Sequence, residues 1–241
     1  MTSTPDLASD SAAEAAGEAV PGAVPDAVTD SVKEAVTDAV RIGGQLVDLG
    51  LSPGASGNIS VRVGERTYMS PTGVSLGELR AEDLSVMDAE GTQLAGLRAS
   101  KEYPLHAAMY AKDPQAGAVI HLHSAQAMAA SCLPPASARS ALPPVTPYLV
   151  MRVGRVPFVG YAPPGSVELG DELSRVEGLF HGALLANHGL IVAGRDMEQA
   201  LDRAVEVEEA CRLYVQLFGA PARWLSEDDV AVLTERHGMP W

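Results

Sequence analysis

The sequence predicts an α/β protein whose sheet is largely antiparallel. Two long stretches, residues 29–50 and 196–218, repeat apolar side chains every three or four positions, the spacing of an amphipathic helix. Between them, residues 59–63 alternate as a strand does, and a second short strand at 67–69 follows a tight turn. Such hairpins join antiparallel neighbours. With 241 residues, the chain can bury a sizeable core.

The composition excludes some classes of partner. The chain has 31 acidic and 17 basic residues and a net charge of -14, whereas nucleic-acid-binding domains usually carry a basic surface. A small anionic substrate stays compatible, because a pocket can be locally positive on an acidic protein. No apolar run is long enough to span a membrane, and the N-terminus lacks a secretory signal. We therefore expect a soluble, cytoplasmic protein with no nucleic-acid or membrane partner.

The chain divides into a tail and one folded domain. Residues 1–26 are rich in alanine, proline and acidic residues and poor in large apolar ones, so we expect a disordered tail there. Residues 27–241 are expected to form the domain. Its two cysteines, Cys132 and Cys211, are expected to be buried free thiols, which suits a reducing compartment.

The stretch around which the chain is organised contains His121 and His123. It follows a short apolar run at 118–120 that reads as a buried strand, and residues two apart in a strand point to the same side. Both imidazoles can therefore reach one zinc ion, although two histidines hydrogen-bonded in the core would look the same. A catalytic zinc needs a third ligand. His188, at a break between two apolar strands, is either that ligand or a plain turn residue.

A carboxylate and an ammonium group stand at the start of the next predicted helix. Ser100 is expected to be its N-cap, which places Lys101 and Glu102 in the first turn, a natural anion site. A first-turn glutamate is equally well explained as ordinary helix chemistry. His106 lies four residues after Glu102 on the same face, so the two could share a metal, but we favour a helix-stabilising hydrogen bond.

Two hydroxyl-rich turns, residues 56–58 and 70–73, could bind an anion through exposed backbone N–H groups or could simply be turns. Residues 133–165 are rich in proline, and we expect short strands at 151–153 and 156–159 within them. Further along the chain, we expect His181 to be exposed. The acidic residues of the last long helix are expected to face solvent: Glu206, Glu208 and Glu209.

Taken together, five motifs in chain order resemble the class II aldolase/adducin superfamily. They are Ser56-Gly-Asn-Ile-Ser60, Ser70-Pro-Thr-Gly73, Ser100-Lys-Glu102, His121-Leu-His-Ser124 and Asn187-His-Gly189. The resemblance covers roughly residues 32–218. It implies a three-layer α/β/α sandwich with a central mixed, mostly antiparallel sheet. It also implies a homotetramer with fourfold symmetry whose active sites lie at subunit boundaries.

The resemblance also implies roles for individual residues. His121, His123 and His188 correspond to the ligands of one zinc ion per subunit, and Glu102 to a catalytic acid/base that can ligate the metal before the substrate displaces it. The residues that match the family's phosphate pocket are Gly57, Asn58, Thr72, Gly73 and Ser100. Tyr148 corresponds to a tyrosine that reaches the neighbouring subunit's site.

One departure from the aldolase pattern points to a subgroup. Fuculose-phosphate aldolase has serine where this chain has Lys101, and residues 142–157 and 184–189 also look closer to the subgroup that decarboxylates 3-oxo-tetronate 4-phosphate. That reaction, part of four-carbon sugar-acid catabolism, is a metal-dependent carbon–carbon lyase step that passes through an enediolate to dihydroxyacetone phosphate and CO2. Lys101 could pair with the phosphate or the departing carboxylate, whereas Arg152 and Arg155 are more simply structural.

Two alternatives stay open. One is a class II aldolase that cleaves a sugar phosphate, such as fuculose 1-phosphate, into dihydroxyacetone phosphate and an aldehyde. The other is a non-catalytic, adducin-like binding protein.

Overall fold

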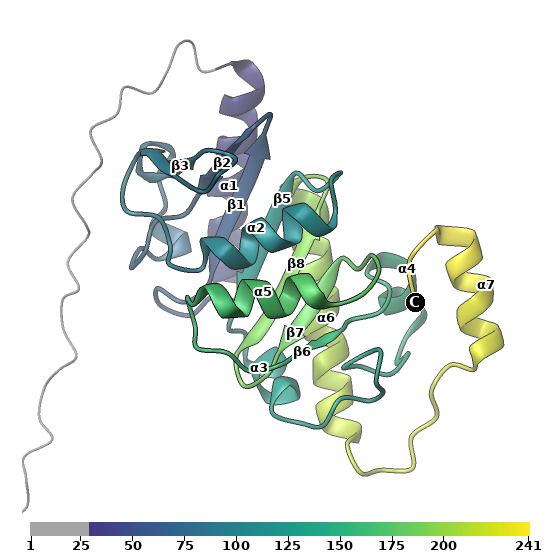
Figure 1. Cartoon of the computed structure of the whole chain (residues 1–241). Helices are drawn as coiled ribbons and strands as arrows, with labels where there is room; N and C mark the ends of the chain where they lie inside the picture. The colour runs from purple at the N-terminus through teal and green to yellow at the C-terminus, as the bar shows by residue number, and fades with distance from the viewer. Residues whose placement is uncertain (1–28) are drawn as a thin grey trace, which may run out of the picture.

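The computed structural model describes residues 29–241, so the tail predicted at residues 1–26 lies outside the described residues. The strands of the described part form one eight-stranded sheet in the order β4-β3-β2-β1-β5-β8-β7-β6 (Figure 1). Every neighbouring pair is antiparallel except β6 and β7. The strands are β1 (Asn58–Val63), β2 (Arg66–Met69), β3 (Ser85–Met87), β4 (Gln93–Ala95), β5 (Ala118–Leu122), β6 (Phe158–Val159), β7 (Gly182–Leu185) and β8 (Gly189–Gly194).

Helices cover both faces of this sheet. They are α1 (Asp30–Asp48), α2 (Tyr103–Lys112), α3 (Ala125–Ser131), α4 (Pro147–Arg152), α5 (Val167–Arg175), α6 (Met197–Leu217) and α7 (Glu227–His237), with short 3-10 turns η1 (Leu76–Glu78) and η2 (Ala81–Asp83). Within residues 29–241, none of them is long and apolar enough to cross a membrane.

The core lies in two layers, one on each face of the sheet. α1, α3 and α6 pack on one face, while α2 and α5 pack together on the other (Figure 1). Successive residues of a strand point to opposite faces, so Ile120 of β5 joins the α1/α6 layer and Val119 joins the α2/α5 layer. The predicted three-layer α/β/α sandwich with a mixed, mostly antiparallel sheet is confirmed.

The two long helices form where the apolar spacing predicted them. α1 buries Val36, Ile42 and Leu46 against the sheet. α6 begins after Asp196, whose carboxylate accepts a hydrogen bond of 2.8 Å from the backbone N–H of Gln199, as an N-cap does. α6 therefore backs β5 and β8, beside the histidines, and α1 backs β1.

A helix, α4, stands where we expected a strand at 151–153. Thr146 is its N-cap and accepts a 3.1 Å hydrogen bond from the backbone N–H of Leu149, and Pro147 takes the first helical position. A threonine cap followed by proline is a strong helix start, and it outweighs the β-branched residues that follow. The strand expected at 156–159 shortens to β6.

Two further expectations about burial were wrong. His181 is only 8% exposed, and its Nδ1 lies 3.2 Å from Oδ2 of Asp113. Cys211 is buried and Cys132 is exposed, and both are free. Cys132 is the C-cap of α3, where the chain turns outward. The apolar residues next to Cys132 in the sequence therefore did not indicate that its side chain would face solvent.

Glu208 of α6 does not face solvent as expected. Its carboxylate accepts hydrogen bonds from the Ser124 hydroxyl at 2.6 Å and from the backbone N–H groups of Gln126 and Ala127 at 2.9 Å each. These contacts satisfy the N-terminus of α3, where free N–H groups carry partial positive charge. Because Ser124 directly follows His123, Glu208 anchors the end of the His-x-His segment.

Replacing Glu208 by alanine is expected to lower the free energy of unfolding by about 1–3 kcal/mol, because two helix N–H groups and one hydroxyl lose a charged acceptor. Glu209→Ala is the matched control: Glu209 is exposed on the same helix and pairs with Arg212 at the surface, where an ion pair contributes less than about 1 kcal/mol. Urea unfolding measures both variants. Equal losses would contradict the capping role of Glu208.

Candidate metal centre and active site

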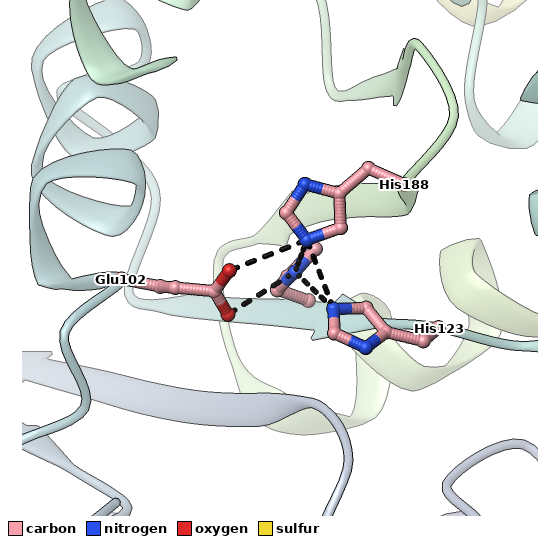
Figure 2. Close-up of side chains that lie close together, drawn as sticks. Glu102, His123 and His188 are labelled. Carbon is pink, nitrogen blue, oxygen red and sulfur yellow. Dashed lines mark hydrogen bonds and ion pairs between the residues drawn. The ribbon is translucent and has the colours of Figure 1, made fainter. Parts of the chain in front are cut away.

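Three distant parts of the chain bring four side chains together at one end of the sheet. His121 and His123 come from the end of β5, His188 from the turn that joins β7 to β8, and Glu102 from the residue before α2. β8 pairs with β5 so that Ile191 lies opposite His121, which puts the β7–β8 turn next to the two histidines of β5. Figure 2 shows Glu102, His123 and His188 pointing toward one another.

The four side chains meet closely enough to share one ion. The Nε2 atoms of His121 and His123 are 3.0 Å apart, those of His121 and His188 3.3 Å, and those of His123 and His188 3.0 Å. Glu102 adds its Oε2 at 3.3 Å from His121 Nε2 and its Oε1 at 3.2 Å from His188 Nε2. All four donor atoms lie within 4.8 Å of one another.

The protonation pattern of this cluster fits a bound cation. Nδ1 of His121 lies 2.7 Å from the carbonyl oxygen of Leu190, which can only accept, so Nδ1 carries the proton and Nε2 is bare. The Nε2 lone pair of His121 then points at the other two imidazoles. Oε1 of Glu102 is also buried without a hydrogen-bond partner. A cation among these atoms would satisfy both the lone pair and the orphaned oxygen.

The pKa shifts favour the forms that bind metals. Burial, with smaller effects from His121 and His188, lowers the pKa of His123 to about 4. Burial by itself raises the pKa of the Glu102 carboxyl, but the adjacent imidazoles of His121 and His188 and the hydrogen bond from Asn58 outweigh burial and hold this pKa well below its usual range. At neutral pH, His123 is therefore neutral and Glu102 ionised, as metal coordination requires.

Glu102 is the N-cap residue of α2, not a first-turn residue as expected, and its side chain does not cap the helix. Instead, Oε2 accepts a 2.7 Å hydrogen bond from Nδ2 of Asn58. Ser100, the expected N-cap, accepts a 3.3 Å hydrogen bond from the Glu102 backbone N–H. The helix therefore starts two residues later than predicted, which leaves the carboxylate free to face the histidines.

The expected relation between Glu102 and His106 was wrong. Nε2 of His106 lies 2.6 Å from Oδ1 of Asn58, and its Nδ1 lies 2.7 Å from the Ser60 hydroxyl. The His106 side chain thus reaches the Glu102 carboxylate through Asn58, while its backbone N–H donates to the Glu102 carbonyl at 3.4 Å. This role of His106 was not predicted from the sequence, in which the one available signal was its position one helical turn after Glu102 on the buried face.

The segments predicted to bind phosphate lie next to Glu102. Asn58 begins β1 and is paired with His121 across the sheet. Gly57 has a positive φ of 79°, and a Cβ there would lie 2.8 Å from the carbonyl oxygen of His121, so only glycine fits. The two other predicted phosphate-binding segments, residues 70–73 and the residues before Ser100, are joined by an isolated β-bridge between Pro71 and Ala99. This bridge puts the turn that contains Thr72 and Gly73 beside the segment that leads to Ser100.

The remaining predicted residues lie farther out. Lys101 is exposed beside Gly165, where a Cβ would come within 2.6 Å of the lysine Cδ. Tyr148 is 57% exposed on α4, and the Arg152 guanidinium lies 5.5 Å from the centre of its ring. Arg155 is buried and donates to backbone carbonyls of neighbouring loops. Its role is therefore structural, as expected.

The fold and the cluster together define a class of protein. The chain matches the family described as Class II Aldolase and Adducin N-terminal domain over residues 37–215, so it belongs to the class II aldolase/adducin family. It is 42% identical over 198 residues to the 3-oxo-tetronate 4-phosphate decarboxylase of Haemophilus influenzae, over 82% of this chain and 94% of that protein. The resemblance inferred from the motifs, including that to the decarboxylase subgroup, is confirmed.

Solved structures agree with this assignment. A putative aldolase/epimerase/decarboxylase from Escherichia coli superimposes with a TM-score of 0.79 at 34% identity, over 83% of this chain and 98% of that one. An L-fuculose 1-phosphate aldolase gives a TM-score of 0.74 at 26% identity, over 86% of this chain and 97% of that one. The family's architecture therefore extends over almost all of the described chain.

The buried histidines should make the stability of the metal-free protein depend on pH. Burial lowers the pKa of His106 to about 3 and that of His123 to about 4, against about 6.5 in the unfolded chain. Below pH 6.5 these two histidines bind protons in the unfolded state but stay neutral in the folded state. The free energy of unfolding therefore falls as the pH falls, by up to about 1.4 kcal/mol per pH unit for each histidine.

Urea unfolding of chelator-treated protein between about pH 7.5 and pH 5 measures this slope, because the Glu102 carboxyl stays ionised in both states over that range. His106→Gln removes one of the two groups and should flatten the slope, while His237→Gln, at an exposed position of α7, should leave it unchanged. A His106→Gln variant with the wild-type slope would contradict the assignment.

Proposed function

We propose that this protein is a metal-dependent carbon–carbon lyase that decarboxylates 3-oxo-tetronate 4-phosphate to dihydroxyacetone phosphate and CO2, in four-carbon sugar-acid catabolism. The observation that carries the proposal is the buried cluster of Glu102 with three histidines, in a chain 30–42% identical to five proteins that bear this enzyme's name. A cluster of this kind also favours an enzyme over a non-catalytic, adducin-like binding protein.

The metal in this proposal is one zinc ion per subunit, held by His121, His123 and His188, with Glu102 as a fourth ligand that the substrate displaces. Three neutral imidazoles are a common ligand set for catalytic zinc. When bound, zinc would act as a Lewis acid and stabilise the negative charge that develops on the substrate's ketone oxygen. The convergent Nε2 atoms and the orphaned Oε1 of Glu102 support this assignment.

The chain's own residues would bind the substrate and move the proton. Gly57, Asn58, Thr72, Gly73 and Ser100 would bind the phosphate and hold the ketone in place, which lowers the entropic part of the barrier. Lys101 would pair with the phosphate or the departing carboxylate.

When the bond to the carboxylate breaks, its electron pair stays on the carbon beside the ketone and gives an enediolate. Glu102, ionised in the free site, would take up a proton from solvent once the substrate displaces it from the metal, and would then protonate that carbon as the general acid. Asn58, whose amide donates to Oε2 of Glu102, is well placed to orient this carboxyl group.

The alternative is an aldolase that uses the same site. L-fuculose phosphate aldolase of Methanococcus maripaludis is 34% identical over 160 residues, which cover 66% of this chain. Cleavage of a sugar phosphate such as fuculose 1-phosphate would pass through the same enediolate, and Glu102 would protonate it in the same way; only the reverse, condensing direction would need Glu102 to abstract that proton. Lys101, which directly precedes Glu102 in the sequence, favours a substrate that carries both a phosphate and a carboxylate.

The proposal extends to assembly and location. We propose a cytoplasmic homotetramer in which Tyr148 reaches the active site of the neighbouring subunit, and its 57% exposure in the single chain supports this role. The catalytic domain would comprise residues 27–241, with residues 1–26 as an acidic tail outside it.

The direct test is a coupled assay of zinc-loaded protein with 3-oxo-tetronate 4-phosphate. Dihydroxyacetone phosphate is followed by its reduction with a dehydrogenase, and CO2 is measured in parallel. We expect equal amounts of both products and their loss after EDTA treatment. If protein that retains its metal releases an aldehyde from fuculose 1-phosphate and no CO2 from the sugar acid, the aldolase alternative holds instead.

Two substitutions separate metal binding from proton transfer. Glu102→Gln should keep the metal, since three histidines remain, but lower kcat at least about 100-fold because the general acid is lost. His123→Ala should lose the metal itself, and His237→Ala is the matched control on exposed α7. Elemental analysis and the coupled assay read out both effects. Full activity of Glu102→Gln would contradict proton transfer by Glu102. Unchanged metal content in His123→Ala would contradict metal binding by His123.

A further inference from the structure

A chain of buried hydrogen bonds leads away from Glu102 into the protein. It runs from Oε2 of Glu102 to Nδ2 of Asn58 at 2.7 Å, and from Oδ1 of Asn58 to Nε2 of His106 at 2.6 Å. It continues from Nδ1 of His106 to the Ser60 hydroxyl at 2.7 Å and on to the Tyr110 hydroxyl at 2.9 Å. All five side chains are buried.

The chemistry of the partners determines the direction of every bond. An ionised Glu102 carboxylate only accepts, so the Asn58 amide must present its NH2 group to it and its oxygen to His106. His106 must then donate from Nε2. Burial lowers the pKa of His106 to about 3, so the ring is neutral and Nδ1 accepts from the Ser60 hydroxyl. Ser60 in turn accepts from Tyr110, and every donor in the chain points toward Glu102.

This series of hydrogen bonds restrains the Glu102 carboxylate, which α2 leaves free. Glu102 makes no capping bond to α2, and its Oε1 has no hydrogen-bond partner. Asn58 is thus the hydrogen-bond donor that holds Oε2. The Asn58 amide can rotate about its side-chain bond unless something fixes its oxygen, and His106 provides that contact from one helical turn beyond Glu102.

We propose that His106 is a positioning residue that acts through Asn58 to hold the Glu102 carboxylate in its working orientation. The inference deepens the proposed function and rests on it, since it assumes that Glu102 transfers the proton. Residues that orient a reacting group from behind typically change rates 10–100-fold when removed. The expected signature is a loss in kcat with little change in KM, because His106 lies behind Asn58 and does not itself contact the substrate.

Two isosteric substitutions test the contact. In His106→Gln the side-chain NH2 can reach the position of Nε2 and donate to Asn58, whereas in His106→Asn the shorter amide reaches only the position of Nδ1 and contacts Ser60. We expect His106→Gln to keep kcat within about 5-fold of wild type and His106→Asn to lose about 10–100-fold. KM and metal content should stay within about 2-fold in both. His237→Asn is the surface control.

Coupling to Asn58 separates positioning from a general loss of structure. In an Asn58→Ala background, His106→Asn should lower kcat no further, because the contact through which it acts is already gone. Two results would overturn the proposal: an equal loss of kcat in His106→Gln and His106→Asn, or additive losses in the double variant.

Two measurements need no turnover and keep the inference separate from the proposed function. Ring nitrogen NMR shifts of zinc-loaded protein should show a proton on Nε2 of His106 and none on Nδ1. Crystal structures should show the Glu102 carboxylate displaced in His106→Asn but in place in His106→Gln. Inactivity of the wild-type protein on the sugar acid would refute the proposed function alone, whereas the opposite tautomer or an unmoved carboxylate in His106→Asn would refute the positioning role.

Discussion

The convergence of three imidazole nitrogens on one point is the constraint on which the rest of this structure depends. Lone pairs within 3.3 Å of one another repel unless a cation or a shared proton lies between them. Only a rigid backbone can hold the three imidazoles so close together. The central position of β5, with β1 on one side and β8 on the other, supplies it.

The surroundings of the cluster hold each of its members separately. The carbonyl of Leu190 determines the tautomer of His121, and Glu208 anchors the segment that follows His123. Glu102 is held from the opposite side by Asn58 and, behind it, His106. Each support comes from a different element of the fold, so the geometry of the site depends on how both helical layers pack on the sheet. A site built from side chains of several elements benefits from such preorganisation.

Much of the fold and of the site could be predicted from the sequence because the signals were local. The apolar spacing of α1 and α6 and the His-x-His strand follow from periodicity alone, and the five motifs identified Glu102 and the histidines. The predictions that failed were of another kind. His181 and Cys132 had misleading neighbours in the sequence, and α4 formed because a threonine cap and a proline outweighed the β-branched residues after them.

The sequence by itself therefore determined most of the secondary structure, the family and the identity of the chemical groups. Tertiary structure alone decided which residues support them. Glu208 contacts Ser124 across 84 positions of the chain, and Asn58 joins Glu102 and His106 across 44 and 48. No periodicity or spacing encodes contacts at that range, because they arise only when the sheet order places β1 beside β5 and α6 beside α3.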